Sequence, residues 1–138
     1  MINSRLISDL KPEVAVLASA FIAGCRAAGV EVIITSTYRD VEAQDAIFAQ
    51  GRTLPGRVIT NCRGGNSMHQ YRVAFDFCPL NAKGAPDWND SSLWRKCGKI
   101  GQDLGLEWGG SWESFTDMPH FQFTQGKTIA QLHQEYQA

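Results

Sequence analysis

Two histidines and two aspartates in this chain have types and spacings suited to metal-dependent hydrolysis. His69 and Asp76 lie in the segment SMHQYRVAFDF, and Asp117 and His120 lie in FTDMPHFQF. Two histidines and one carboxylate are a common ligand set for a catalytic zinc ion, which keeps one further position open for water. His69, Asp76 and His120 are therefore the candidate ligands. Asp117 is left as the candidate for proton transfer.

Apolar alternation predicts that each of these segments enters a β-strand. Apolar residues recur at every second position in both, which is the period of a half-buried strand. The side chains predicted to face the core are Val73, Phe75, Phe77, Phe121 and Phe123. Asp76 and His120 then point to the opposite face. On the residues alone, the alternative that each histidine is a satisfied core or surface side chain stays open.

Periodicity along the rest of the chain predicts the elements that position these residues. A helix is expected after Leu10, a strand over 30–36, a helix over 41–50, a short strand over 57–60, a helix over 91–104 and a last helix from Thr128. The apolar faces of the last two are expected to be Leu93, Cys97, Ile100 and Leu104, and Ile129, Leu132 and Tyr136. This order predicts an α+β fold in a single domain over residues 1–138, with helices packed around a small antiparallel sheet.

Composition is that of an ordinary globular domain. The chain has 138 residues, 43% hydrophobic and 20% charged, with a formal net charge of −1. We therefore expect no nucleic-acid partner. No stretch reaches the ~18–20 apolar residues of a membrane span, and the amino terminus does not have the pattern of a Sec signal peptide. The four cysteines form no CxxC pair, and Cys25 and Cys97 are expected to pack as small apolar residues.

The ordered motifs resemble those of the zinc D,D-peptidase-like family, which includes D-Ala-D-Ala carboxypeptidases and dipeptidases. The chain is most similar to the L-alanyl-D-glutamate endopeptidase branch, found as phage endolysins and bacterial wall-remodelling enzymes. The segments that carry the resemblance, from about Leu10 to Phe123, are TSTYRD, QGRTLPGRVIT, SMHQYRVAFDF, LGLEWGG and DMPHF. One departure is Arg72, which stands where the family usually has glycine. Glycine permits backbone conformations that arginine disfavours, so we expect a local difference in that turn.

The resemblance implies a D,D-peptidase/hedgehog-like fold and a Zn²⁺ site built from His69, Asp76 and His120. In this family Asp117 corresponds to the general base. Arg39 corresponds to a residue that orients the scissile amide or stabilises the oxyanion. On the residues alone, Arg39 is equally well an ion-pair partner, for example of Asp40 or Glu42.

Further residues are candidates for contact with substrate, namely Ser67, Tyr38, Trp108 and Trp112. Ser67 either positions substrate or braces its loop, and the two tryptophans either wall a cleft or pack in the core. No acidic residue occurs between Asp45 and Asp76, whereas four arginines do, at positions 52, 57, 63 and 72. These arginines either attract a substrate that carries carboxylates or are solvated loop residues.

The leading hypothesis is a zinc metallopeptidase that hydrolyses the L-Ala–D-Glu bond of peptidoglycan stem peptides. The alternatives are a D-Ala-D-Ala carboxypeptidase or dipeptidase, and a catalytically silent, zinc-stabilised wall-binding module. Asp117 argues against the silent module, because a structural metal site has no use for an unligated acid. We expect a monomer made in the cytoplasm without a signal peptide, acting on the wall after holin-type or other export.

Overall fold

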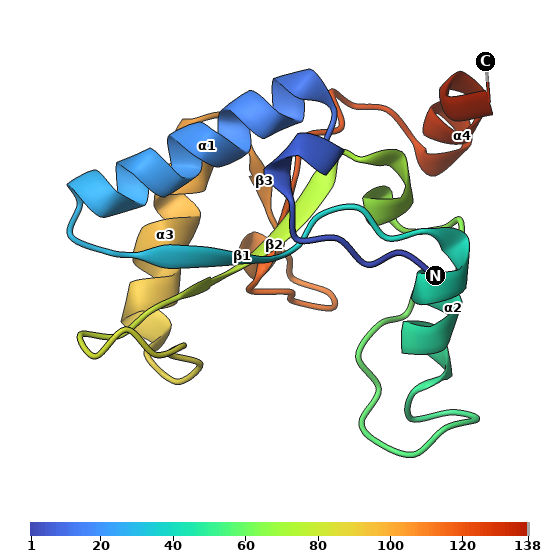
Figure 1. The fold of residues 1–138 in the computed structure, drawn as a ribbon, viewed down its shortest axis with the longest axis horizontal. Coiled ribbons are helices and arrows are strands. Elements are labelled where there is room, and N and C mark those ends of the chain that lie inside the picture. The colour runs from blue at the N-terminus through green and yellow to red at the C-terminus, as the bar shows by residue number, and fades with distance from the viewer. Residues whose placement is uncertain (138) are drawn as a thin grey trace.

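The computed structural model describes residues 1–137 and shows helices packed around a small sheet (Figure 1). The helices are α1 (Pro12–Ala27), α2 (Val41–Ala49), α3 (Ser91–Asp103) and α4 (Ile129–Gln137). The strands are β1 (Val32–Ser36), β2 (Ala74–Pro79), β3 (Glu107–Trp108) and β4 (His120–Gln122). Short 3₁₀ turns are η1 (Ile7–Asp9), η2 (Met68–Tyr71) and η3 (Gly109–Ser111). The α+β class predicted from the sequence is confirmed.

The sheet has four antiparallel strands in the order β1-β2-β4-β3. Strand β2 is therefore internal, and its register with β4 places Asp76 directly opposite His120. Strand β1 pairs with β2 on the other side, with an irregularity that lets Ser36 face Asp76. Two residues that are 44 positions apart in the chain are thus cross-strand neighbours.

One face of the sheet packs against α1 and α3 and forms the core. Phe21 of α1 contacts three sheet residues, with ring-centroid distances of 6.1 Å to Phe75, 5.0 Å to Phe77 and 4.8 Å to Phe121. All four rings are fully buried. The predicted alternation is therefore confirmed for β2 and for Phe121, and it leaves Asp76 and His120 on the other face.

Helix α3 packs partly through the predicted face, because Cys97 is buried and Leu93 and Ile100 pack against the core. Its buried residues are Trp94, Cys97, Gly98 and Gly101, whereas Leu104 is 36% exposed. A β-carbon at Gly98 would lie 2.4 Å from the Trp108 ring, and one at Gly101 would lie 2.3 Å from Phe121. The two glycines therefore let α3 approach the sheet closely. A prediction based on the spacing of apolar residues therefore misses Trp94 and the two glycines, which are the most closely packed part of this face.

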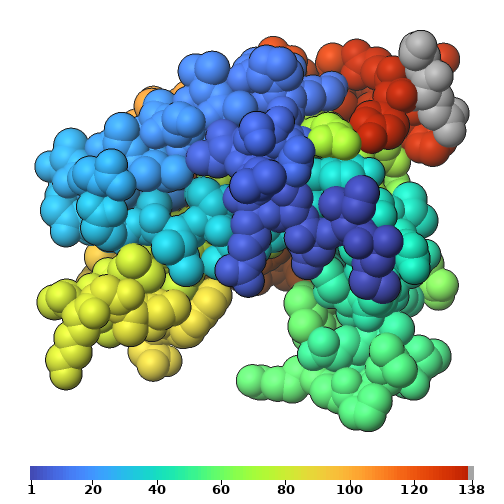
Figure 2. All heavy atoms as spheres, in the orientation of Figure 1, coloured from blue at the N-terminus to red at the C-terminus, as the bar shows by residue number. Residues whose placement is uncertain are grey.

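Two other predicted features differ in the structure. Residues 57–60 form no strand and belong to a loop, residues 50–66, which we call the arm. The arm projects beyond α2 (Figure 1). In α4, Leu132 is buried as predicted, but Tyr136 is 49% exposed. Figure 2 shows the surface hollowed between the arm and the 80–90 loop.

The turn at Arg72 adopts the conformation that glycine would favour. Arg72 has φ 63° and ψ 26°, in the left-handed region. Its guanidinium lies 3.9 Å over the Tyr38 ring and donates a hydrogen bond to the Asp9 carbonyl oxygen at 2.8 Å. These contacts offset the strain of a positive φ in a residue with a β-carbon. The expected local difference is thus a change of side chain on a glycine-like backbone.

The four cysteines are free thiols in the described chain, and Cys25, Cys78 and Cys97 are buried. The predicted packing role of Cys25 and Cys97 agrees with their place in the core between α1 and α3. Within residues 1–137, no helix has the length and apolar character needed to cross a bilayer.

Candidate active site

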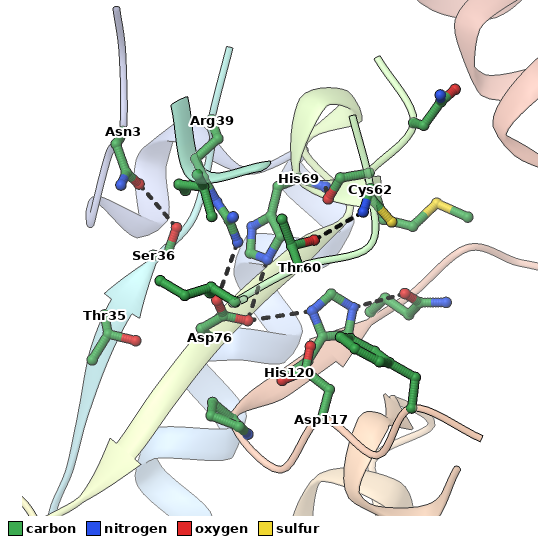
Figure 3. A pocket seen from close by; sticks show the side chains of 18 of the residues that line it. Asn3, Thr35, Ser36, Arg39, Thr60, Cys62, His69, Asp76, Asp117 and His120 are labelled. Carbon is green, nitrogen blue, oxygen red and sulfur yellow. Dashed lines mark hydrogen bonds and ion pairs between the residues drawn. The ribbon is translucent and has the colours of Figure 1, made fainter. Parts of the chain in front are cut away.

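A cavity of about 450 Å³ lies on the polar face of the sheet. Its walls come from β1, β2, β4, the arm and the loop that precedes β4. Arg39, His69, Asp76, Asp117 and His120 all line it, so the structure gathers the predicted metal-binding and catalytic residues in one place (Figure 3).

His69, Asp76 and His120 have a geometry that can hold one metal ion. One atom of each lies within 4.8 Å of the others. His69 Nε2 is 3.2 Å from Asp76 Oδ1, and His120 Nδ1 is 3.3 Å from the same oxygen. Asp76 and His120 are held by cross-strand pairing, and His69 is held by the η2 turn. All three come from separate elements around the internal strand.

Hydrogen bonds fix which nitrogen of each histidine faces Asp76. His69 Nδ1 lies 2.7 Å from the Thr37 carbonyl oxygen, so this nitrogen carries a proton and donates it. His120 Nε2 likewise donates to Gln122 Oε1 at 2.8 Å. The Gln122 amide is oriented by donating to Glu107 Oε2 at 2.9 Å. His69 Nε2 and His120 Nδ1 therefore present lone pairs, as metal-ligating histidines with outer hydrogen-bond partners do.

His69 Nε2, His120 Nδ1 and Asp76 Oδ1 are all electron-pair donors, so a positive charge between them would stabilise their close approach. Two imidazole lone pairs that point at one carboxylate oxygen repel it unless a proton or a cation intervenes. Burial lowers the pKa of His120, but its contact with Asp76 outweighs burial and leaves that pKa raised. Burial lowers the pKa of His69, which favours the neutral, ligating form. The nitrogen and oxygen donor set fits zinc.

Arg39 pairs with the candidate ligand Asp76. Arg39 Nη2 lies 3.2 Å from Asp76 Oδ2, the oxygen that the histidines leave free. The alternative pairing with Asp40 or Glu42 is wrong, because the structure brings Arg39 to Asp76 and uses Asp40 to cap α2 at Ala43 N–H. A guanidinium carries five N–H donors, so Arg39 retains donors beyond these contacts.

Gln44 connects Arg39 to the arm through a buried amide. Gln44 is 1% exposed. Its Oε1 accepts from Arg39 Nη1 at 3.1 Å and from Gln70 Nε2 at 3.3 Å. Its Nε2 donates to the Cys62 carbonyl oxygen at 2.9 Å and to Thr60 Oγ1 at 3.4 Å. The guanidinium orientation and the position of the arm are thus held by one side chain.

Asp117 lines the cavity without joining the three-residue cluster. Burial raises the pKa of its carboxyl group. Its backbone N–H donates to the Gly109 carbonyl oxygen at 3.0 Å, and its carbonyl accepts from His120 N–H at 3.2 Å. A β-carbon at Gly109 would lie 2.3 Å from the Asp117 carbonyl oxygen. Glycine at 109 therefore permits the close approach that sets Asp117 beside His120 (Figure 3).

The four candidates for substrate contact fall into two groups. Ser67 and Trp112 line the cavity, with the Trp112 ring 5.4 Å from that of His120. Ser67 also caps η2, because its hydroxyl accepts from His69 N–H at 3.3 Å. Trp108 belongs to the core instead and donates its indole N–H to the Met118 carbonyl oxygen. The Tyr38 ring packs against the Arg72 guanidinium, and Tyr38 is not one of the residues that line the cavity.

The four arginines between Asp45 and Asp76 do not line the cavity. The guanidinium carbons of Arg52 and Arg63 lie 3.8 Å and 4.6 Å from the centroid of the Phe48 ring. Arg72 occupies the turn that ends η2. Their placement favours the alternative that they are loop residues with structural contacts.

Asn3 lines the cavity although no sequence pattern marks it. Residues 2–4 run beside residues 37–40 through backbone hydrogen bonds such as Ser4 N–H to the Tyr38 carbonyl oxygen at 2.8 Å. Asn3 Oδ1 then accepts from the Ser36 hydroxyl at 3.0 Å. Such a contact depends on pairing between distant segments, which local sequence patterns do not report.

Comparison with known proteins identifies relatives of this chain by sequence. A family model described as D-alanyl-D-alanine carboxypeptidase matches residues 60–123. The peptidoglycan L-alanyl-D-glutamate endopeptidase CwlK of Bacillus subtilis is 38% identical in an alignment over 123 residues that covers 83% of this chain and 74% of CwlK. The L-alanyl-D-glutamate peptidase of Listeria phage A118 is 35% identical over 97 residues, 69% of this chain but only 31% of the phage protein.

Solved structures share the fold. The L-Ala D-Glu endopeptidase ChiX of Serratia marcescens has a TM-score of 0.64 at 20% identity, covering 96% of this chain and 87% of ChiX. The vancomycin resistance D,D-pentapeptidase VanY, solved in complex with Zn(II), has a TM-score of 0.63 at 16% identity, covering 100% of this chain and 85% of VanY.

The chain thus combines the fold of these solved structures with a His-Asp-His cluster that could hold a metal ion. Its identity to CwlK over nearly three quarters of that enzyme shows that the chain belongs to the L-alanyl-D-glutamate endopeptidase branch of the D,D-peptidase-like family.

Proposed function

We propose that the protein is a zinc-dependent endopeptidase that hydrolyses the L-Ala–D-Glu bond of peptidoglycan stem peptides. The observation that carries the proposal is the convergence of His69 Nε2, His120 Nδ1 and Asp76 Oδ1 beside an unligated acid, Asp117. The relatives named for L-alanyl-D-glutamate cleavage support the choice of bond. The D-Ala-D-Ala carboxypeptidase alternative becomes an outcome of the test below.

His69, Asp76 and His120 are the proposed ligands of the ion. A zinc ion bound there supplies Lewis-acid polarisation of the scissile carbonyl group and lowers the pKa of water toward ~7. The protein's own contribution is to hold the two histidines neutral and correctly oriented, through Thr37 and Gln122.

Asp117 is the proposed general base and acid. It accepts a proton from the attacking water as the water oxygen adds to the carbonyl carbon of L-Ala. It then donates that proton to the nitrogen of D-Glu as the C–N bond breaks. The products are a new carboxylate on L-Ala and a new amine on D-Glu. A raised pKa suits both halves of this role, since the group must take up a proton and release it again.

Arg39 is the proposed stabiliser of charge on the carbonyl oxygen. It lines the cavity, and its contacts to Asp76 and Gln44 fix the plane of its guanidinium. An additional N–H donor of a fixed guanidinium can meet a developing oxyanion without reorganisation. Arg39 also neutralises part of the Asp76 charge, so a substitution there is expected to affect metal binding as well as turnover.

The decisive experiment is digestion of purified peptidoglycan, followed by identification of new amino termini by mass spectrometry. The expected result is D-Glu as the new amino-terminal residue, with L-Ala left on the glycan and no D-Ala released. Asp117→Asn supplies the matched control, which should produce no new D-Glu amino terminus and release no D-Ala. Release of D-Ala alone would replace the proposal with a D,D-carboxypeptidase.

A further inference from the structure

A second, smaller cavity adjoins the active site and is built around two stacked tryptophans. It has a volume of about 150 Å³ and is lined by Trp88, Asn89, Ser91, Trp94, Met118 and Pro119. Pro119 also lines the active-site cavity and directly precedes His120. The two cavities therefore share a wall.

Trp88 is presented rigidly even though it is 59% exposed. Its ring stacks on Trp94 with a centroid distance of 5.5 Å and an interplanar angle of 29°. Trp94 is buried, packs on Phe77 at 5.0 Å and donates its indole N–H to the Asp87 carbonyl oxygen at 2.9 Å. Asp87 Oδ1 also accepts the backbone N–H groups of residues 89 and 90. Both the ring and the loop of Trp88 are thus held in place.

The chemistry of this cavity suits a neutral ring with polar substituents. None of its six lining residues carries a charge. The Asn89 amide and the Ser91 hydroxyl lie at an exposed rim, where they can hydrogen-bond a ligand. The faces of indole rings attract C–H groups, which carry partial positive charge. A sugar ring offers C–H groups on its faces and hydroxyl and acetamido groups at its edge.

The size of the cavity argues for one such ring. Cavities that take drug-sized ligands have volumes of about 300–1,000 Å³, and stable protein interfaces bury about 800 Å² on each partner. A space of about 150 Å³ with two tryptophans matches neither. It matches a single ring whose attached chain extends into the larger cavity next to it.

We propose that the Trp88–Trp94 cavity is a sugar subsite that binds the N-acetylated amino sugar attached to the L-Ala of the substrate. The inference rests on the proposed function, because only in that reaction does the sugar lie one residue from the scissile bond. The sugar on the amino-terminal side of L-Ala would then stack on Trp88 while the L-Ala–D-Glu bond lies at the metal site.

Matched substrates test the subsite. The kcat/KM of the zinc-loaded wild-type protein is measured on N-acetylmuramoyl-L-Ala-D-Glu-diaminopimelate and on the sugar-free N-acetyl-L-Ala-D-Glu-diaminopimelate. We expect the sugar-bearing peptide to be preferred about tenfold, the factor that corresponds to an aromatic contact of ~1.4 kcal/mol. Trp88→Ala should remove this preference and leave kcat/KM on the sugar-free peptide unchanged, whereas Trp88→Phe should retain part of it.

A remote control and a binding measurement complete the design. Leu104→Ala removes a partly exposed apolar side chain of α3 outside the cavity and should leave the preference unchanged. Titration with tri-N-acetylchitotriose, followed by tryptophan fluorescence, should show saturable binding by the wild type that Trp88→Ala loses. Melting temperatures of all variants establish that each is folded.

The outcomes separate the two proposals. Failure of the wild type to cleave either peptide overturns the proposed function and the subsite with it. Cleavage of both peptides with equal kcat/KM overturns the subsite alone. An equal loss on both peptides in Trp88→Ala also overturns it, because Trp88 would then serve the peptide or the fold. A dimer that Trp88→Ala dissociates would show the tryptophan to be a contact between copies and not a sugar site.

Discussion

Asp117 and Asp76 share one cavity but have opposite electrostatic surroundings. Asp76 contacts Arg39 and two histidines, and although burial raises its pKa, the histidines hold that pKa well below the usual range. The pKa of Asp117 is raised, chiefly because its carboxyl group is buried. A carboxyl group whose pKa is raised by folding makes the folded state less stable at pH values where it is ionised. Ionised Asp117 thus lowers the stability of the folded state, which a residue with a purely structural role would not be expected to do.

Replacement of Asp117 by asparagine separates the base from the ligands. The variant should bind zinc like the wild type and lose about 10²–10⁴-fold in kcat, since it removes proton transfer alone. Its metal-free form should melt at or above the wild-type temperature at pH 7, because a buried charge has been removed. Zinc analysis, peptide hydrolysis and thermal melts in chelator measure the three effects.

His120→Ala is the matched variant for this test, and it should lose both metal and activity. Zinc loss in Asp117→Asn as large as in His120→Ala would show that Asp117 is itself a ligand.

The residue types and spacing suffice to nominate the four central side chains, but not the groups that orient them. Gln122 is adjacent to the motif, yet its role depends on Glu107, which is 15 residues away and pairs with it across β3 and β4. Gln44 lies only five residues after Arg39, but its amide also donates to the Cys62 carbonyl oxygen, 18 residues further along the chain. Hydrogen bonds between distant segments have no local pattern in the sequence, so these residues could not be found there.

The turn between η2 and β2 sets the direction of the chain from His69 to Asp76. Arg72 occupies it in a left-handed conformation. Its side chain then ties this turn to η1 and to the residue before Arg39 through the Asp9 carbonyl oxygen and the Tyr38 ring. The strain at one residue is therefore balanced by contacts that only a long cationic side chain makes.

Two substitutions at position 72 distinguish backbone strain from side-chain contact. Both Arg72→Gly and Arg72→Ala remove the contacts, but only glycine removes the cost of a positive φ. Arg72→Gly should therefore be more stable than Arg72→Ala by about 1 kcal/mol, a difference of roughly 3 °C in Tm for a domain of this size. Thermal unfolding of the two metal-free variants measures it. Equal Tm values would mean that the turn rearranges when the arginine is lost.

Elements with strong periodicity were predictable, and elements defined by glycine packing were not. Strand β2 and helix α1 follow from apolar spacing alone. The face of α3 does not, because Gly98 and Gly101 bury no large side chain of their own and instead admit Trp108 and Phe121. Residues 58–60 have β-branched side chains, but they form no strand, and Val58 and Ile59 are exposed on the arm.

Metal removal should act on the whole molecule. The three proposed ligands come from η2, β2 and β4, so an ion bound to the folded state stabilises it by mass action. Chelation should abolish hydrolysis and lower Tm by several degrees, and added zinc should restore both. The zinc-dependent rise in Tm should shrink as pH falls below neutrality, because protons compete for His120 Nδ1, whose pKa is raised.

Calorimetry at pH 8 and pH 5.5, with and without zinc, measures this effect. His133 provides the control, because it is exposed on α4 and lies outside the cluster. His133→Ala should keep the zinc response, and its loss in that variant would contradict the assigned ligands. Active protein without stoichiometric zinc or another divalent ion would exclude a metal mechanism.

The cross-strand pairing of Asp76 with His120 has a consequence for how the metal and the fold depend on one another. Directly opposite residues of an antiparallel pair have β-carbons about 4.5–5.5 Å apart whether or not a ligand is present. The sheet therefore preorganises two of the three proposed ligands, and the entropy of bringing them together is lost during folding, before any ion binds. Zinc fingers do the reverse and remain unfolded without metal. In this protein the metal-free form should therefore be native and cooperatively folded.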